Sequence, residues 1–191
     1  MPTRSRNGKT RTATTAARKK APARKAPARQ ASKRGSQPTD VLSLLHRDHE
    51  TVGAMIDEIP DCEPGDERLR ELARSMADAL TVHAKIEEDL FYPELRDRSE
   101  DDEQLTDVFE AYTEHDVIKH LLALLKSEKG PDEKFKAELQ VLGESVKHHV
   151  KEEESTIFKL ARKFMSRDEL EECGQEMAAE KERLQASPAR R

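Results

Sequence analysis

One short pattern of histidine and acidic residues occurs twice, and its spacing constrains the fold of this 191-residue chain more than any other feature. His83-Ala-Lys-Ile-Glu87-Glu88 returns as His149-Val-Lys-Glu-Glu153-Glu154. A histidine between two acidic residues stands 34 positions before each copy, in Asp48-His49-Glu50 and Glu114-His115-Asp116, so a single offset of 66 relates the two sets. Histidine and carboxylate at fixed intervals in a helical sequence are what a metal site between helices requires.

The body of the chain is predicted to be helical. It has no tryptophan and 4% aromatic residues, and it is rich in the good helix formers Leu, Ala, Glu and Lys. Apolar residues at intervals of three and four predict four long helices, over about residues 40–59, 66–96, 99–129 and 132–165. Because short loops between long amphipathic helices indicate antiparallel neighbours, we expect an all-α, up-down-up-down four-helix bundle.

The apolar stripes of these helices include the repeated residues. In the second helix, the stripe continues through His83 and Glu87 to Leu90. After the fourth helix, Ser166-Arg-Asp-Glu169 is a capping box and predicts a further, C-terminal helix. We expect this helix to pack on the outside of the bundle, with Cys173 as a small core residue.

Residues 1–39 differ in composition from the rest of the chain. They hold 12 of the 34 Lys and Arg residues and none of the 39 Asp and Glu residues. Without large apolar side chains this segment cannot offset its ordering entropy, so we expect a disordered basic tail. Such a tail can neutralise DNA phosphates, or it can be a solubilising extension. The predicted organisation is a tail (1–39), a bundle (40–165) and a C-terminal helix and tail (166–191).

The composition also indicates a compartment and excludes several kinds of site. No run of 18 apolar residues predicts a membrane span, and no apolar stretch near the N-terminus resembles a secretory signal. Cys62 and Cys173 are too few for a disulfide framework, so we expect a reducing cytoplasm. The sequence contains no glycine-rich phosphate loop, no nucleophile elbow and no paired CxxC motif.

The repeated residues are the candidate metal ligands. Burying an ionised carboxylate without a partner costs several kcal/mol, and two such carboxylates on facing helices also repel each other. A cation between the helices removes both penalties, and histidine with carboxylate suits iron, manganese or zinc better than calcium or magnesium. The alternative for a single histidine is a hydrogen-bonded core residue. The predicted ligands are His49, His83, Glu87, His115, His149 and Glu153.

These motifs resemble the hemerythrin-like HHE cation-binding domain. The resemblance covers about residues 40–165 and rests on Leu45-His-Arg-Asp-His49, His83 to Glu88 with Leu90-Phe-Tyr-Pro93, Glu114-His115, and His149 to Glu154. It implies a non-haem centre of two iron ions, with the four histidines as terminal ligands and the two glutamates as bridging carboxylates. Manganese or zinc is a less suitable occupant.

The chain departs from oxygen-carrying hemerythrins at one position. Those proteins have two histidines four residues apart on the third helix. Here the residue four positions after His115 is Lys119. His120, Glu114 or solvent can complete the coordination shell, and more open positions remain. His46 can also turn inward, whereas His148 is expected at the surface or beside a ligand.

Three functions remain open at this point. The first is a di-iron protein that binds or senses oxygen, peroxide or nitric oxide, or that handles iron in oxidative stress. The second is an enzyme at the same centre, a catalase-like peroxide scavenger. The third is a DNA-associated iron protein that is tethered by residues 1–39. No membrane partner is expected.

Overall fold

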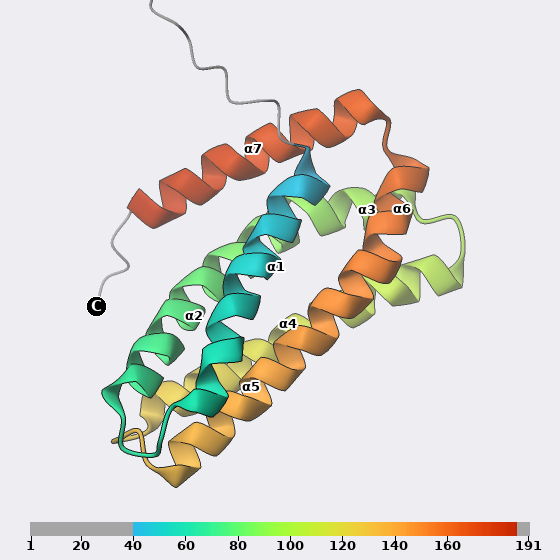
Figure 1. The fold of residues 1–191 in the computed structure, drawn as a ribbon. Helices are drawn as coiled ribbons and strands as arrows, with labels where there is room; N and C mark the ends of the chain where they lie inside the picture. Colours follow the sequence, from blue (N-terminus) through green and yellow to red (C-terminus); the bar gives the residue numbers. More distant parts are fainter. Residues whose placement is uncertain (1–39, 187–191) are drawn as a thin grey trace, which may run out of the picture. The chain divides into compact units, whose positions relative to one another are not determined.

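The computed structural model describes residues 40–186, and it confirms the predicted all-α bundle with an additional C-terminal helix (Figure 1). The helices are α1 (Val41–Glu58), α2 (Glu67–Ile86), α3 (Tyr92–Arg98), α4 (Asp102–Ser127), α5 (Glu133–Glu152), α6 (Phe158–Phe164) and α7 (Arg167–Ala186). A short 3₁₀ turn, η1 (Ile59–Asp61), follows α1, and two π-helical turns, η2 (Glu87–Phe91) and η3 (Glu153–Ile157), join α2 to α3 and α5 to α6. Four rods therefore build the bundle: α1, α2–η2–α3, α4 and α5–η3–α6.

Aspartate side chains fix where the rods begin. The carboxylate at each of four helix starts accepts a hydrogen bond from a backbone N–H of the first turn, at 2.8–3.0 Å. Each such cap contributes about 1 kcal/mol to the helix. The four caps are Asp40, Asp66, Asp101 and Asp132. The capping box before α7 is also formed, because the Ser166 amide donates to the Glu169 carboxylate at 2.7 Å.

The two π turns begin at corresponding residues. η2 starts at Glu87 and η3 at Glu153, so the offset of 66 holds for the backbone as well as for the side chains. A π turn contains an extra residue, which shifts the buried face of everything that follows. Leu90, where the predicted stripe ends, is therefore only half-buried at the edge of the core, while Phe91 and Tyr92 are fully buried.

Proline is not the common cause of these turns. Pro93 lies in the first turn of α3 and has no N–H to continue the α-helical ladder. The corresponding position in the other half is Lys159, yet η3 forms there all the same. Single π turns inside α-helices occur frequently at functional sites. The two turns therefore point to the region around Glu87 and Glu153 as a candidate site.

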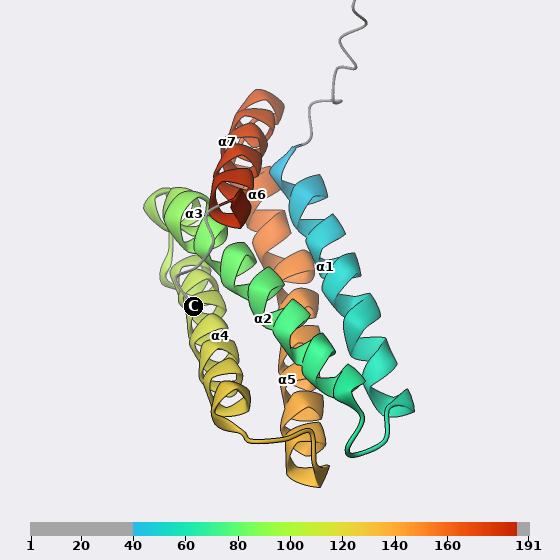
Figure 2. The same cartoon turned by 90° about the vertical axis from the view of Figure 1, so that its left-hand side faces the viewer.

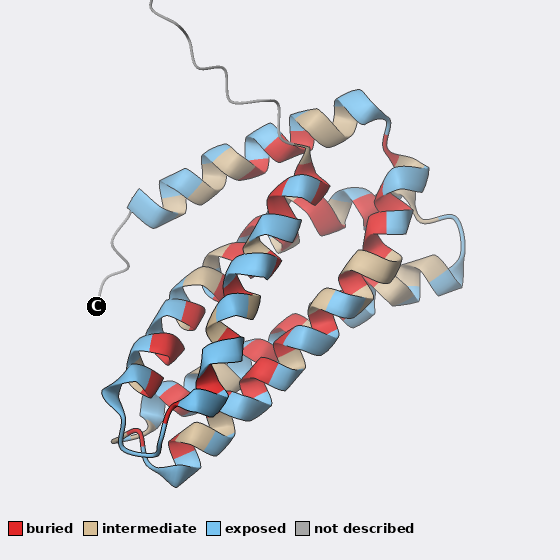
Figure 3. Ribbon diagram, in the orientation of Figure 1, coloured by how far each residue is buried: buried red, intermediate tan, exposed pale blue. Residues whose placement is uncertain are grey.

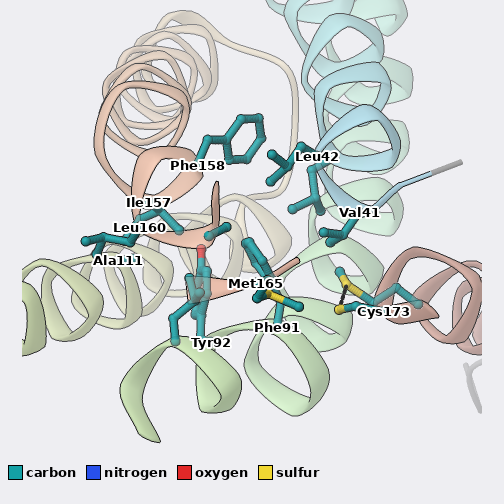
Figure 4. Close-up of a cluster of buried hydrophobic side chains, with 14 of the residues drawn as sticks. Val41, Leu42, Phe91, Tyr92, Ala111, Ile157, Phe158, Leu160, Met165 and Cys173 are labelled. Carbon is teal, nitrogen blue, oxygen red and sulfur yellow. Dashed lines mark hydrogen bonds between the residues drawn. The ribbon is translucent and has the colours of Figure 1, made fainter. Parts of the chain in front are cut away.

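Buried residues occur along all the helices of the bundle (Figure 3), and the apolar ones form two clusters. The first holds residues from the start of α1, from α3 and α6, and from α7, and Figure 4 shows many of its side chains. The second holds residues from the end of α1, the start of α2, the end of α4 and most of α5. On α1, Leu45 belongs to the first cluster and Val52 to the second, so the intervening turn lies at the boundary.

Helix α7 covers one side of the bundle. It runs across α1, α2 and η2, as two perpendicular views show (Figures 1 and 2). Met177 is fully buried, and the sulfur of Cys173 lies 3.8 Å from the Met177 sulfur (Figure 4). The prediction of an outer helix with Cys173 facing the core is confirmed.

Residues 1–39 and 187–191 lie outside the described residues. The predicted disorder and DNA contact of residues 1–39, and the boundary before residue 40, stay predictions. No helix among residues 40–186 combines the length and the apolar character that crossing a membrane requires.

Candidate metal centre

All six predicted ligands lie in the interior between the two apolar clusters. Each is at most 6% exposed, and no other histidine, aspartate or glutamate of residues 40–186 is buried to this extent. Two come from α2–η2, two from α5–η3, and one each from α1 and α4. They are His49, His83, Glu87, His115, His149 and Glu153.

Within this set, four donors form a first group: His49, His83, Glu87 and Glu153. One potential ligand atom of each lies within 4.8 Å of the others. His49 Nε2 is 3.0 Å from Glu153 Oε2, and His83 Nε2 is 3.2 Å from Glu87 Oε2. Such a group of two imidazoles and two carboxylates matches the donor set that non-haem iron, manganese and zinc prefer.

A second group contains Glu87, His115 and His149. His115 Nε2 lies 3.3 Å from Glu87 Oε2 and 3.2 Å from His149 Nε2. Glu87 therefore belongs to both groups, while Glu153 lies farther from the second one, at 3.9 Å from His149 Nε2. Two adjacent cation positions that share one carboxylate would be consistent with this arrangement.

The outer nitrogen of each of these histidines faces a second layer of carboxylates. The pairs are His49 with Glu154 (2.9 Å), His83 with Asp48 (3.6 Å), His115 with Glu88 (2.8 Å) and His149 with Glu114 (2.9 Å), in each case through Nδ1. A carboxylate that accepts the Nδ1 proton leaves Nε2 free to bind a cation and fixes the plane of the ring.

The sequence carries a signal for this second layer of carboxylates. Asp48 and Glu114 directly precede the buried histidine of α1 and of α4. Glu88 and Glu154 directly follow the buried glutamate of each half. All four obey the same offset of 66. The acids beside the motif thus lie against buried histidines of neighbouring helices.

The pKa values of the two central carboxyl groups are shifted in opposite directions. Burial, reinforced by the charge of Glu153, raises the pKa of Glu87 well above its usual range. Burial also opposes ionisation of Glu153, but contacts with His49 and His149 outweigh it and hold the Glu153 pKa low. Burial lowers the pKa of His83 to about 4, so this ring is neutral near pH 7 and able to act as a ligand.

Several polar atoms in the centre make no hydrogen bond within the described residues. Both carboxylate oxygens of Glu87, Oε2 of Glu153 and Nε2 of His49 are among them. Leaving buried acceptors unpaired costs about 1–3 kcal/mol each, and more when they are charged. All of these atoms are electron-pair donors of the kind a cation binds, so the donor chemistry fits a metal.

Tyr92 is a neighbour of the centre that the sequence did not reveal. Its hydroxyl donates to Glu153 Oε1 at 3.1 Å and lies 3.5 Å from His115 Nε2. The π turn brings this residue inward, which a uniform helical periodicity does not predict. Burial, together with the charge of Glu153, raises the Tyr92 pKa well above its usual range, so the hydroxyl keeps its proton.

The candidates for a fifth terminal ligand lie outside the centre. Of the two side-chain candidates, His120 is exposed. Lys119, at the position where a further histidine is missing, pairs with Glu88 at 2.7 and 2.9 Å. Glu114 contacts the outer nitrogen of His149.

The remaining two histidines contact the second layer. His46 Nδ1 lies 2.8 Å from Glu154, and His148 Nε2 lies 3.2 Å from Glu114. Both rings are more than half exposed, so the structure places neither among the central donors.

Comparisons with known proteins agree with this geometry. Residues 40–161 match the family described as hemerythrin HHE cation binding domain. A crystal structure of a hemerythrin HHE cation binding domain-containing protein from Mycobacterium kansasii has a similar fold, with a TM-score of 0.66 and 22% identity. That similarity covers 77% of this chain and 88% of the other.

The chain is also similar to a protein named DNA nickase from Nostoc sp. (strain PCC 7120). The two are 29% identical over 150 residues, which is 78% of this chain. The aligned part spans only 41% of the length of that relative.

Proposed function

We propose that this chain, which belongs to the hemerythrin HHE cation-binding domain family, holds two iron ions without haem and uses them to bind oxygen, peroxide or nitric oxide. The observation that carries the proposal is the pair of buried donor groups with Glu87 in common. The proposed ligands are His49, His83, Glu87, His115, His149 and Glu153.

The small, buried donor set favours small ligands over organic substrates. Iron in a histidine and carboxylate environment supplies an open coordination position and redox chemistry. The two apolar clusters shield the centre from bulk water on the sides that they cover. Lys119 pairs with Glu88 where a further histidine would stand in an oxygen carrier, so we favour ligand sensing or peroxide turnover over reversible oxygen carriage.

Residues of this chain other than the ligands have definite roles in this proposal. The outer carboxylates hold the imidazole rings in place through Nδ1. The Tyr92 hydroxyl holds a proton 3.1 Å from Glu153 Oε1, inside the centre and away from solvent. It is the group best placed to donate a hydrogen bond to a small polar ligand there.

Metal analysis tests the proposal. Protein loaded with ferrous iron without oxygen should contain about two iron ions per chain and should absorb in the near ultraviolet after exposure to air. The His83→Ala variant should lose metal, whereas His148→Ala, a matched change at an exposed histidine, should keep it. Protein that takes up no iron under these conditions would contradict the proposal.

The catalase-like alternative has a separate readout. Oxygen evolution from hydrogen peroxide should exceed that of an equal concentration of free iron if the loaded protein turns peroxide over. A rate equal to that of free iron would leave ligand binding or sensing as the function.

Association with DNA is a second candidate, supported by the basic residues 1–39 and by the relative that is named DNA nickase. DNA affinity should fall steeply with salt and should be lost in a chain that starts at Ser36. Supercoiled plasmid, incubated with the loaded protein, would reveal nicking as relaxed circles. An affinity that is unchanged by the truncation would exclude the basic segment as the cause.

A further inference from the structure

A small cleft on the side of α4 and η3 leads from the surface to the metal centre. Its volume is about 50 Å³, which is room for a few water molecules, since one needs about 10–15 Å³. Carboxylates dominate its lining: Asp107, Glu110, Glu114, Glu152 and Glu153. The last of these is also a member of the buried donor set, so the cleft and the centre share a side chain.

Among the described residues, Glu152 is the one carboxylate of the cleft that pairs with a lysine, Lys151 at 3.3 Å, so most of the negative charge there is not neutralised by Lys or Arg. Burial raises the pKa of Asp107, and the charges of Glu110, Glu103 and Asp101 raise it further. Glu114 contacts only histidine rings among the described residues, those of His148 and His149.

Glu153 provides the observation that links this acidic lining to a ligand. Its side chain is 1% exposed, and its Oε2 atom makes no hydrogen bond within residues 40–186. The nearest ring nitrogen, His49 Nε2, lies at 3.0 Å but is not aligned for a hydrogen bond. A buried carboxylate oxygen without a hydrogen-bond partner, in a cleft lined by other carboxylates, is a receptor for a cation.

The opposite half of the bundle shows that the acids are not required by the fold. Val41, Leu44, Ile86 and Leu90 stand 66 positions before Asp107, Glu110, Glu152 and Thr156. These four apolar residues belong to the first cluster or pack against it, as do Cys173 and Met177 of α7. The same position in the architecture is therefore apolar and covered in one half, and acidic and open in the other.

We propose that this acidic cleft is the route by which a divalent cation, ferrous iron, reaches the centre, with Asp107 and Glu110 attracting the ion and Glu153 receiving it. The inference rests on the proposed function. A cleft of one charge raises the local concentration of oppositely charged ions and their rate of association by roughly 10–10³-fold. Carboxylate oxygens replace water molecules of the ion as it moves inward, and the same charges repel anions.

Stopped-flow loading with Co²⁺, monitored by its visible absorption, measures the rate without redox chemistry. In the Asp107→Asn/Glu110→Gln variant, loading at low ionic strength should be about 10-fold slower and should depend less on salt. Neither residue contacts a proposed ligand, so the final metal content, measured by native mass spectrometry, should be unchanged. The matched control Glu144→Gln/Glu172→Gln removes two exposed charges elsewhere and should load at the normal rate.

A second variant tests the route without altering charge. Thr156 lines the cleft, and the corresponding residue of the other half is Leu90. The Thr156→Leu variant should therefore load metal more slowly but reach the same final metal content. Circular dichroism establishes that each variant is folded, and either folded variant suffices for the test. Normal loading rates in a folded variant overturn the route and leave the proposed function intact. Unmodified protein that binds neither Co²⁺ nor iron overturns the proposed function, and the route with it.

Discussion

The two halves of the bundle, residues 41–98 and 102–164, carry the same buried donors and the same π turns at an offset of 66, but their surroundings differ. The first half is closed by α7, which packs along α1, α2 and η2. The second half has a cleft lined by carboxylates at the corresponding place. Equivalent candidate ligands thus lie in unequal environments, and the proposed entry route depends on this difference.

The aromatic residues beside the centre differ in the same way. The Phe158 ring stacks on His49 with centroids 6.1 Å apart. Its counterpart Tyr92 lies beside His115 at 5.4 Å and adds a hydroxyl that reaches Glu153. Only one of the two positions therefore brings a proton into the centre.

The largest expected effect tests whether the two central glutamates are equivalent. Because Glu87 belongs to both donor groups and Glu153 to one, Glu87→Ala should bind less than one iron per chain, while Glu153→Ala should keep about one. Metal analysis after removal of loosely bound iron measures this. Equal metal contents in the two variants would show that both carboxylates contact both ions.

The next prediction concerns α7, the helix that packs on the first half of the bundle. Met177→Ala removes a fully buried side chain and should reduce the free energy of unfolding by about 2–5 kcal/mol. Gln175→Ala, at an exposed position of the same helix, is the control and should have little effect. Urea unfolding compares them, and equal stabilities would mean that α7 contributes little to the core.

A smaller loss of stability is expected at the Tyr92 position. In metal-free protein, Tyr92→Phe removes a hydrogen bond to an ionised carboxylate and should cost about 1.5–3 kcal/mol. Tyr112→Phe removes a longer, 3.4 Å contact from a half-buried hydroxyl to a backbone carbonyl and should cost less. Thermal unfolding distinguishes the two variants, and the reverse order would argue against a bond between Tyr92 and Glu153.

The smallest expected effect compares the outer carboxylates of the two halves. Glu114→Gln should weaken metal affinity by roughly 10-fold, because its contact with His149 Nδ1 is 2.9 Å. Asp48→Asn should have a smaller effect, since Asp48 is 3.6 Å from His83 and also pairs with Lys181 of α7. Competition with a chelator gives both affinities, and the opposite ranking would assign Asp48 the greater part in orienting its histidine.

Much of the architecture followed from the sequence because two periodicities agree. The helical stripes placed the helices, and the offset of 66 selected the six polar residues that the structure then brings together. The capping aspartates and the box at Ser166 could be read from local chemistry alone. That the six buried histidine and glutamate residues bind metal stays a prediction.

The π turns mark where such reasoning ends. One additional residue in a turn is invisible to a pattern of three and four, so Leu90 was assigned to the core and Tyr92 was missed. The sequence also does not show which helices α7 covers. The apolar stripe of α7 predicts that one face is buried, but not against which helices it packs. Long-range packing decided both features.

The division of the core into two clusters gives the centre a mechanical role. A metal ion in the centre would connect all four rods. It would also link the two apolar clusters, which the buried histidines and glutamates otherwise separate. A ligand that binds only the folded state stabilises it by RT ln(1 + [L]/Kd). If the centre binds metal as proposed, the cooperativity with which the two ends of the bundle unfold would depend on the free metal concentration.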